Sequence, residues 1–299
     1  MEISKSKNGC TLITVNGITK NITQWAKDYN ISPKTLSGRI AKGYDEFHIF
    51  DTPDRHKTRP KFNENYFDNI DTADKAYWLG FIWSDGYLGY RIRENNKEEY
   101  NLKISLCKTD YDHLDKFNKC IDGKYKVKFY KSSSSYINDC EEARLFITNK
   151  HMGEVLRNKY GIVPRRSNCE NVIKNIPDNF KSDFIRGIVD ADGSFSYYTV
   201  TQNEHICNKY IFQICGSESL LRYIEQVFMD NGLIDSMKRK LYKRHKEESK
   251  DLNCFTLMLS GRHNVISVLD FLYKDSSIYL DRKYDKYITL KGYGESNEV

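Results

Sequence analysis

The sequence predicts an α+β protein made of two similar units, each with the element order αββαββα, preceded by a small helical module. Residues 78–86 read WLGFIWSDG and residues 185–193 read IRGIVDADG, so an apolar, helix-like run ends twice in Asp-Gly. Matching patterns of strands and helices follow both runs. A duplication of this kind is typical of two units that pack as a pseudo-symmetric pair and share a site at their contact.

Length and charge favour a multidomain protein with a polyanionic partner. The 299 residues suffice for two or three domains. The net charge of +6 comes with clusters of Lys and Arg interleaved with Tyr and Asn, which favour contacts with nucleic-acid phosphates. The alternative for any single cluster is a solvated basic face.

Cysteine usage and the N-terminus favour a reduced compartment. The eight cysteines are scattered with no CxxC pair, which argues against zinc and against a disulfide framework. The chain begins without the apolar core of a signal peptide, and no apolar run approaches membrane-spanning length. We expect a cytoplasmic protein that is not secreted.

The first fifty residues predict a hairpin followed by two short helices. Residues 11–20 alternate apolar and polar side chains around Asn16-Gly17, a strong hairpin signal. Thr23 is expected to cap a helix that ends at Asn30, and Ser32-Pro33 to begin the next. Candidate DNA-contacting residues on the polar side of the second helix are Lys34, Thr35, Ser37 and Arg39. This plan matches a helix-turn-helix, and a small helical domain with a solvated basic face is the alternative.

Composition also indicates where the domains divide. Two prolines, few aliphatic residues and a basic middle predict an extended linker over residues 51–70. The expected domains are therefore a helix-turn-helix-like module at 1–50, a first repeated unit at 71–176 and a second at 177–299.

The helix that begins each unit carries small side chains at helical spacing. Thr72 is expected to cap the first helix, and Gly86 is the glycine typical just past a helix C-terminus. Small residues recur one turn apart in both copies: Ala76, Gly80 and Ser84 in the first, Gly187 and Ala191 in the second. Two such helices can pack with their backbones nearly touching.

Four strands and two helices are expected after each of these helices. In the first unit the strands are 87–92, 101–106, 126–131 and 143–149, and in the second 195–200, 210–216, 236–243 and 254–260. Each unit should form an antiparallel sheet with helices on one face. The opposite faces are expected to contact a DNA major groove through Tyr87, Arg91, Arg93, Lys103, Tyr197, Thr199, Gln202, Lys238 and Lys240.

The two motif aspartates predict a metal site. Side-by-side parallel packing would bring Asp85 and Asp192 to the same end of their helices, where the carboxylates repel and face the negative end of each helix dipole. Either one protonates or a cation lies between them. A hard divalent ion such as Mg²⁺, or Mn²⁺, would satisfy both carboxylates and support metal-assisted phosphodiester hydrolysis.

Both motifs, WLGFIWSDG and IRGIVDADG, resemble those of the LAGLIDADG homing endonucleases in their single-chain form, over roughly residues 71–290. The N-terminal module resembles the helix-turn-helix modules attached to phage-borne homing endonucleases, which implies a host of phage or bacterial type. The resemblance implies saddle-like antiparallel sheets, a monomer, and a divalent-metal-dependent double-strand cut at a long, pseudo-palindromic DNA site, in intron homing or as a free-standing enzyme.

By position, the resemblance implies that Asp85 and Asp192 are the catalytic metal ligands, with backbone carbonyls of Ser84 and Ala191 as further ligands. It implies catalytic roles for three basic residues as well: Lys108, Arg166 and Lys283. The motif's earlier acidic position is Asp190 in the second copy and Trp83 in the first, so Asp190 is expected to have a structural or capping role.

A different class of function stays open. Proteins of this type also serve as non-cleaving nucleic-acid binders, either intron RNA maturases or transcription regulators. Retention of Asp85 and Asp192 argues against pure binding, because two repelling acids bring a binder no evident gain.

Overall fold

The computed structural model describes residues 1–6, 8–44, 49–50, 60–94, 96–131, 141–164, 168–202, 205–235, 239–243 and 253–293. The chain divides into two compact units, Met1–Arg59 and Pro60–Val299. Each has its own hydrophobic core. Among the described helices, none combines the length and apolar character that crossing a membrane requires.

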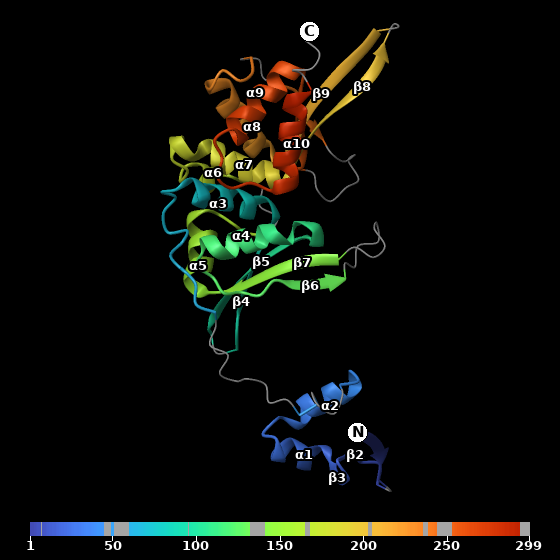
Figure 1. Ribbon diagram of the computed structural model, residues 1–299. Helices are drawn as coiled ribbons and strands as arrows, with labels where there is room; N and C mark the ends of the chain where they lie inside the picture. Colours follow the sequence, from blue (N-terminus) through green and yellow to red (C-terminus); the bar gives the residue numbers. More distant parts are fainter. Residues whose placement is uncertain are drawn as a thin grey trace. The chain divides into compact units, whose positions relative to one another are not determined.

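The smaller unit begins with a three-stranded antiparallel sheet in the order β1-β2-β3 (Figure 1). Its strands are β1 (Glu2–Lys5), β2 (Thr11–Val15) and β3 (Ile18–Asn21). The predicted hairpin is confirmed, since Asn16 and Gly17 join β2 to β3 with φ of 51° and 77°, as a type I′ turn requires. Strand β1 was not predicted, and its polar sequence EISK explains why.

Two short helices complete this unit: α1 (Ile22–Asp28) and α2 (Pro33–Ala41). The expected cap of α1 is wrong by two residues. Asn21 is the N-cap, because its side chain accepts from the Gln24 N–H while the Gln24 side chain accepts from the Asn21 N–H, a capping box. The start of α2 is as predicted, with Ser32 accepting from Thr35 N–H and Pro33 in the first turn. A groove-reading role for these helices stays a prediction.

The larger unit contains the repeat. Its first half consists of α3 (Ala73–Asp85), β4 (Gly86–Ile92), β5 (Glu98–Cys107), α4 (Tyr111–Cys120), β6 (Lys128–Lys131), β7 (Glu141–Thr148) and α5 (Lys150–Glu154). Its second half consists of α7 (Lys181–Asp192), β8 (Gly193–Gln202), β9 (His205–Gly216), α8 (Glu218–Asp230), β10 (Tyr242–Lys243), β11 (Phe255–Ser260) and α9 (Arg262–Tyr273). A short helix, α6 (Glu170–Ile173), lies between the halves in sequence, and α10 (Asp281–Gly292) follows the second.

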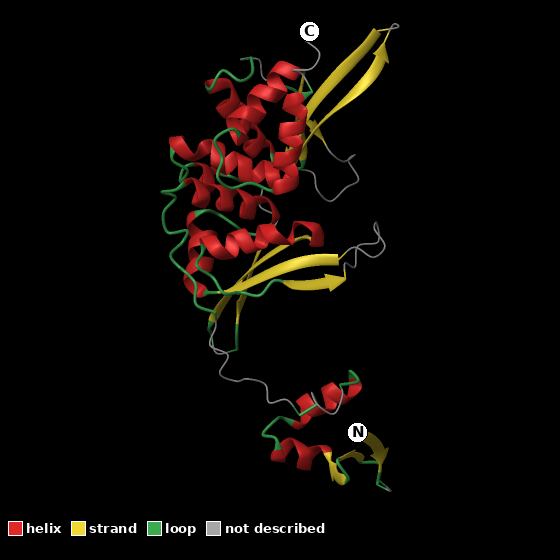
Figure 2. Cartoon of the chain, viewed as in Figure 1, coloured by secondary structure: helices red, strands yellow, loops and turns green. Residues whose placement is uncertain are grey.

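Strand pairing shows that the halves are equivalent. The four-stranded sheets have the orders β4-β5-β7-β6 and β8-β9-β11-β10, and every pair is antiparallel. The predicted fold class and duplication are therefore confirmed for this unit (Figure 2). Helix α10 was not predicted.

Helices α3 and α7 lie side by side between the two halves (Figure 1). Their glycines make this approach possible: a Cβ added to Gly80 would lie 2.0 Å from the Phe184 carbonyl oxygen, and one added to Gly187 would lie 2.1 Å from that of Tyr77. The expectation that small residues let these helix backbones nearly touch is confirmed.

Both helices end where predicted, but for a different reason. Gly86 and Gly193 have φ of −76° and −83°, which is extended backbone rather than the left-handed cap. A Cβ would lie 2.5 Å from the Ile82 carbonyl oxygen at Gly86 and 2.7 Å from that of Val189 at Gly193. Glycine is needed here for space as each chain turns from helix into strand.

Candidate functional site

Asp85 and Asp192 are the last residues of α3 and α7, the two helices in closest contact. Asp85 is half-buried and Asp192 is exposed. The Lys283 ammonium group donates to backbone carbonyls on either side of Asp192, and the charges of Asp85 and Asp192 oppose the lowering of its pKa by burial. The structure thus brings together three of the five catalytic candidates, at the ends of the motif helices.

Lys283 lies in the first turn of α10 and is 7% exposed. Its Nζ donates to the carbonyl oxygen of Val189, at 2.8 Å, and to that of Gly193. Burial lowers the pKa of Lys283 to about 8, and the carboxylates of Asp190, Asp85 and Asp192 oppose that shift. A cation at the C-terminus of α7 offsets the negative end of the helix dipole, so the chain itself supplies part of the positive charge that paired aspartates require.

A cleft of about 470 Å³ opens beside this site. Its lining comes from both halves of the larger unit: Trp83, Ser84, Gly86, Tyr87, Pro164, Asp192, Cys215, Gly216, Ser217 and Leu220. One of the two aspartates and the expected carbonyl ligand Ser84 therefore border the same open space.

The donor atoms at the helix ends are suited to a hard cation. Two carboxylates and the carbonyls of Ser84 and Ala191 are oxygen donors, which Mg²⁺ and similar ions prefer. Over the described part of the chain, no group of three or more His, Cys, Asp and Glu side chains is placed to hold a metal. An ion held here would have to complete its coordination with backbone oxygens, water or phosphate.

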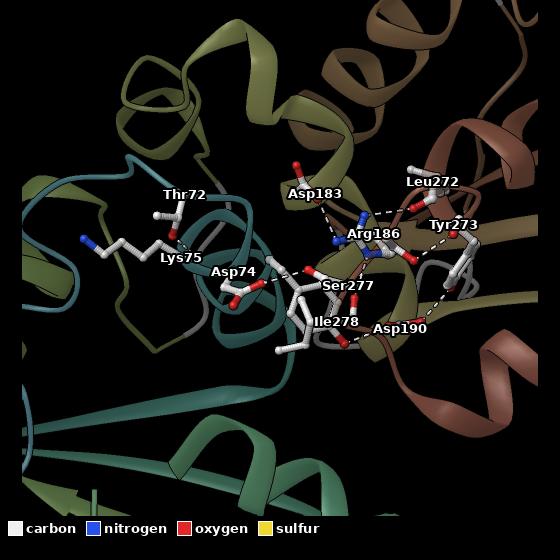
Figure 3. Close-up of polar contacts among 12 residues, drawn as sticks. Thr72, Asp74, Lys75, Asp183, Arg186, Asp190, Leu272, Tyr273, Ser277 and Ile278 are labelled. Atoms are coloured by element: carbon white, nitrogen blue, oxygen red, sulfur yellow. Dashed lines mark hydrogen bonds and ion pairs between the residues drawn. The ribbon is translucent and has the colours of Figure 1, made fainter. Parts of the chain in front are cut away.

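Asp190, two residues before Asp192, is fully buried and accepts three hydrogen bonds (Figure 3). Tyr77 Oη donates to Oδ2 at 2.7 Å, Tyr273 Oη to Oδ1 at 2.6 Å, and the Leu280 N–H to Oδ2 at 2.7 Å. Since Leu280 is the N-cap of α10, Asp190 joins α3, α7 and α9 to the helix that carries Lys283. This agrees with the structural or capping role expected for it.

Arg186, one turn before Asp190, is a second buried group that sequence reasoning did not use. Its guanidinium donates to Ile278 O and Leu272 O, both at 2.9 Å, and to Asp183 Oδ1 at 2.7 Å (Figure 3). The equivalent positions in the first motif are Leu79 and Trp83, both apolar. An arginine inside an otherwise apolar motif helix was the available signal.

The remaining catalytic candidates are placed differently. Lys108 follows β5 and pairs with Glu141 on β7, with its Nζ 5.7 Å from the centroid of the Phe129 ring. That ammonium is thus engaged by a carboxylate at the end of the sheet. Arg166 lies outside the described residues.

Strand register decides which predicted DNA contacts face away from the helices. In the first half Tyr87 and Lys103 alternate with buried strand residues and lie on the outer face. Arg91 shares that face by strand register, and Arg93 follows the end of β4. Arg91 and Arg93 both pair with Glu99. Hydrogen bonds from Asn101, Arg91 and Arg93 lower the pKa of Glu99 to about 2.

In the second half the predicted face is wrong for Tyr197 and Thr199. Side chains alternate along a strand, and both residues share the face of buried Phe195. Tyr197 packs there against Tyr293, with ring centroids 4.2 Å apart. The outer face instead carries Ser194, Ser196 and Tyr198 on β8 with Lys209, Ile211 and Gln213 on β9.

Two more predicted contacts on this sheet cannot be placed. Lys238 and the side chain of Gln202 lie outside the described residues. Lys240 precedes the edge strand β10, with its Nζ 5.7 Å from the centroid of the Tyr242 ring.

In the smaller unit, Lys34 and Ser37 are exposed on α2. Thr35 shares a 2.7 Å hydrogen bond with Ser32 at the helix start, and Arg39 Nη1 donates to Ile49 O at 2.9 Å. Half of this predicted contact set therefore also serves to hold the unit together.

Solved structures share the architecture of the larger unit. The meganuclease I-SmaMI bound to uncleavable DNA has a TM-score of 0.50 at 13% identity, over 73% of this chain and 87% of that one. The I-LtrWI LAGLIDADG homing endonuclease bound to target DNA has a TM-score of 0.51 at 11% identity, over 78% and 91%. No family model and no curated protein matches the sequence. The chain therefore has the fold of the single-chain LAGLIDADG homing endonucleases.

Proposed function

We propose that the protein is a site-specific DNA endonuclease that hydrolyses one phosphodiester bond in each strand at the ends of α3 and α7. The observation that carries the proposal is the convergence of Asp85, Asp192 and Lys283 at that point. The shared fold with DNA-bound endonucleases supports it.

Each half contributes one carboxylate to the reaction. Asp85 and Asp192, with the carbonyls of Ser84 and Ala191, would hold a divalent cation such as Mg²⁺ or Mn²⁺, which when bound supplies an activated water and stabilises phosphate charge. The carboxylates of Asp85 and Asp192 are related by the pseudo-twofold symmetry of the halves, so each would act on one strand of a duplex.

Lys283 acts beside them as a fixed cation. Two of its three N–H donors bond to the carbonyls of Val189 and Gly193, leaving the third to donate to a water or a phosphate oxygen. Charge on the ammonium also draws the DNA backbone toward two carboxylates that would otherwise repel it.

Binding would use the two sheets. Their outer faces carry Tyr87 and Lys103 in one half and Tyr198 and Lys209 in the other, and side chains with such donors suit a major groove. A pseudo-twofold protein of this kind favours a long, pseudo-palindromic target.

The test measures cleavage of a target selected from a randomised duplex library, in Mg²⁺, by wild type and by Asp85→Asn, Asp192→Asn and Asp275→Asn. Asp275 is exposed on the loop after α9, so its variant removes the same charge elsewhere. We expect a loss of at least about a hundredfold in single-turnover rate for the first two variants, and a wild-type rate for Asp275→Asn.

Two results would oppose the proposal. If the wild-type protein binds its selected duplex or an intron RNA tightly and never cuts DNA, it is a nucleic-acid binder. If Asp85→Asn or Asp192→Asn cuts both strands at the wild-type rate, the chemistry lies elsewhere.

A further inference from the structure

The two halves present different side chains at one equivalent position of their sheets. Gly86 pairs with Ile104 and Gly193 with Ile214, so the register of the two central strands β5 and β9 can be matched. One residue on, Tyr87 pairs with Lys103 and Ser194 with Gln213. Lys103 and Gln213 are therefore equivalent.

This position lies on the outer face, close to the aspartates. Tyr87 and Ser194 are each the second residue after a motif aspartate, so their row is the first outward-facing row along the sheet. Lys103 and Gln213 are both half-buried and alternate with buried residues on either side. Their functional groups must then face away from the helices.

The neighbours of Lys103 keep its charge available. Tyr87 lies on one side, with the Lys103 Nζ 5.4 Å from the ring centroid, and Phe146 on the other. Within the described residues Lys103 has no carboxylate partner, whereas Arg91 and Arg93 pair with Glu99. An ammonium without a partner carboxylate, flanked by aromatic rings, is a donor that an incoming acceptor can use.

Gln213 differs from Lys103 in its hydrogen-bonding groups. Its neighbours in the row are Ser194 and Met258, and no described residue hydrogen-bonds its carboxamide. A carboxamide both donates and accepts, while an ammonium only donates. The central strands β5 and β9 thus present side chains with different hydrogen-bonding groups to the two halves of one target.

We propose that Lys103 and Gln213 make the target asymmetric: Lys103 reads a G·C pair in one half-site, and Gln213 reads an A·T pair at the same distance from the centre in the other. In the major groove guanine presents two acceptors, O6 and N7, which suit lysine, whereas adenine presents an N7 acceptor and an N6 donor, which suit glutamine. The inference rests on the proposed DNA-binding function and adds to it the base preference of one position in each half.

The experiment selects preferred duplexes from a randomised library with the full-length protein and then measures affinity for every single-base change in the selected target. Wild type should prefer G·C at one position and A·T at its symmetry mate, by roughly 5- to 150-fold over other pairs. Lys103→Gln should change the first preference to A·T, so that the two half-sites become alike there. Gln213→Lys should change the second to G·C.

Lys174→Gln is the matched control, because Lys174 is exposed, follows α6 and belongs to neither sheet. It removes the same charge and should leave every base preference unchanged. Thermal unfolding of each variant confirms that the fold is retained.

The inference is overturned if Lys103→Gln weakens binding by the same factor for every base pair, which is the behaviour of a phosphate contact. It is also overturned if neither Lys103→Gln nor Gln213→Lys changes the preferred base pair at its position. Cleavage in Mg²⁺ is scored separately on the same duplexes, so a protein that cuts without these preferences retains its proposed function and loses only the base assignment.

Discussion

His113 lies on α4, packs against aromatic rings of α3 and is 2% exposed. Tyr77 Oη donates its proton to Asp190, so it accepts from His113 Nε2 at 2.9 Å. Among the described residues Nδ1 has no hydrogen-bond partner. Burial lowers the pKa of His113 to about 3, and the charges of Lys116 and Arg282 add to that effect. The imidazole is therefore neutral in the folded protein.

This predicts acid sensitivity. The unfolded state binds a proton on His113 below its ordinary pKa of 6.5 and the folded state does not until about 3, so stability falls as the pH drops through that window. Between pH 7 and pH 5 the free energy of unfolding should fall by about 2 kcal/mol more in wild type than in His113→Gln. Denaturant titrations of both proteins at pH 7, 6 and 5 measure this. Equal losses in the two proteins would contradict it.

Asp190 supports a second prediction at this scale. Asp190→Asn replaces one acceptor oxygen by an amide donor, although three donors converge on the carboxylate. We expect a loss of about 2–4 kcal/mol in the free energy of unfolding, because buried donors lose their acceptor. Asp275→Asn, on the surface, should change it by less than about 0.5 kcal/mol. A stability for Asp190→Asn equal to that of wild type would show that the network is dispensable.

Local sequence could predict that Asp85 and Asp192 end two equivalent helices, because a repeated Asp-Gly after an apolar run is visible within nine residues. It could assign Asp190 a structural role but not its partners. Tyr77, Tyr273 and Leu280 lie 113, 83 and 90 positions away. Only the packed arrangement of four helices brings those donors to one carboxylate.

At the scale of elements, the contact of α3 with α7 sets the distance between the two halves. Gly187→Ala would place a Cβ 2.1 Å from the Tyr77 carbonyl oxygen and 2.7 Å from the Phe81 nitrogen. Backbone atoms cannot yield as a flexible side chain can, so the helices must separate. We expect a loss of about 3 kcal/mol in the free energy of unfolding, measured by denaturant titration. The single-turnover cleavage rate should fall as well, because the helices that carry Asp85 and Asp192 move apart.

Gly38→Ala is the control for that substitution. Gly38 lies in the middle of α2, and a Cβ there would meet nothing within 4 Å. The same change should stabilise the smaller unit by about 0.5–1 kcal/mol, because alanine loses less backbone freedom in a helix. If Gly187→Ala behaves like Gly38→Ala, the close approach of α3 and α7 is not what requires glycine.

Elements with a strong periodicity of apolar residues were predictable from the sequence. Elements stabilised by contacts between residues far apart in the sequence were not. Helix α3 and strand β5 follow apolar periodicity, and both lie within a few residues of their expected positions. Helix α10 has a highly charged sequence, and its first turn is held by Asp190 and by the bonds of Lys283 to α7 and Gly193. The face of Tyr197 was mispredicted because a strand of polar and aromatic residues carries no clear alternation.

At the scale of the whole molecule, the two units have separate cores. Residues such as Ile13, Trp25 and Leu36 form the core of the smaller unit, and the larger unit's core extends across both of its halves. The larger unit also contains all the residues that we propose to act in catalysis. Its folding should therefore not depend on the smaller one.

Removing residues 1–59 tests whether the smaller unit contributes to DNA binding and whether the larger unit is sufficient for cleavage. The 60–299 fragment should fold, because the contacts of Asp190, Arg186 and Lys283 all lie within it, and its single-turnover cleavage rate at saturating DNA should stay within about threefold of the full chain. Its affinity for the selected target should fall at least tenfold at physiological salt, because exposed cations such as Lys34 are lost and phosphate contacts dominate affinity. Binding titrations at two salt concentrations measure both the loss and the smaller salt dependence that fewer contacts imply. An unchanged affinity with an unchanged salt dependence would remove the smaller unit from DNA recognition, while leaving the nuclease assignment of the larger unit in place.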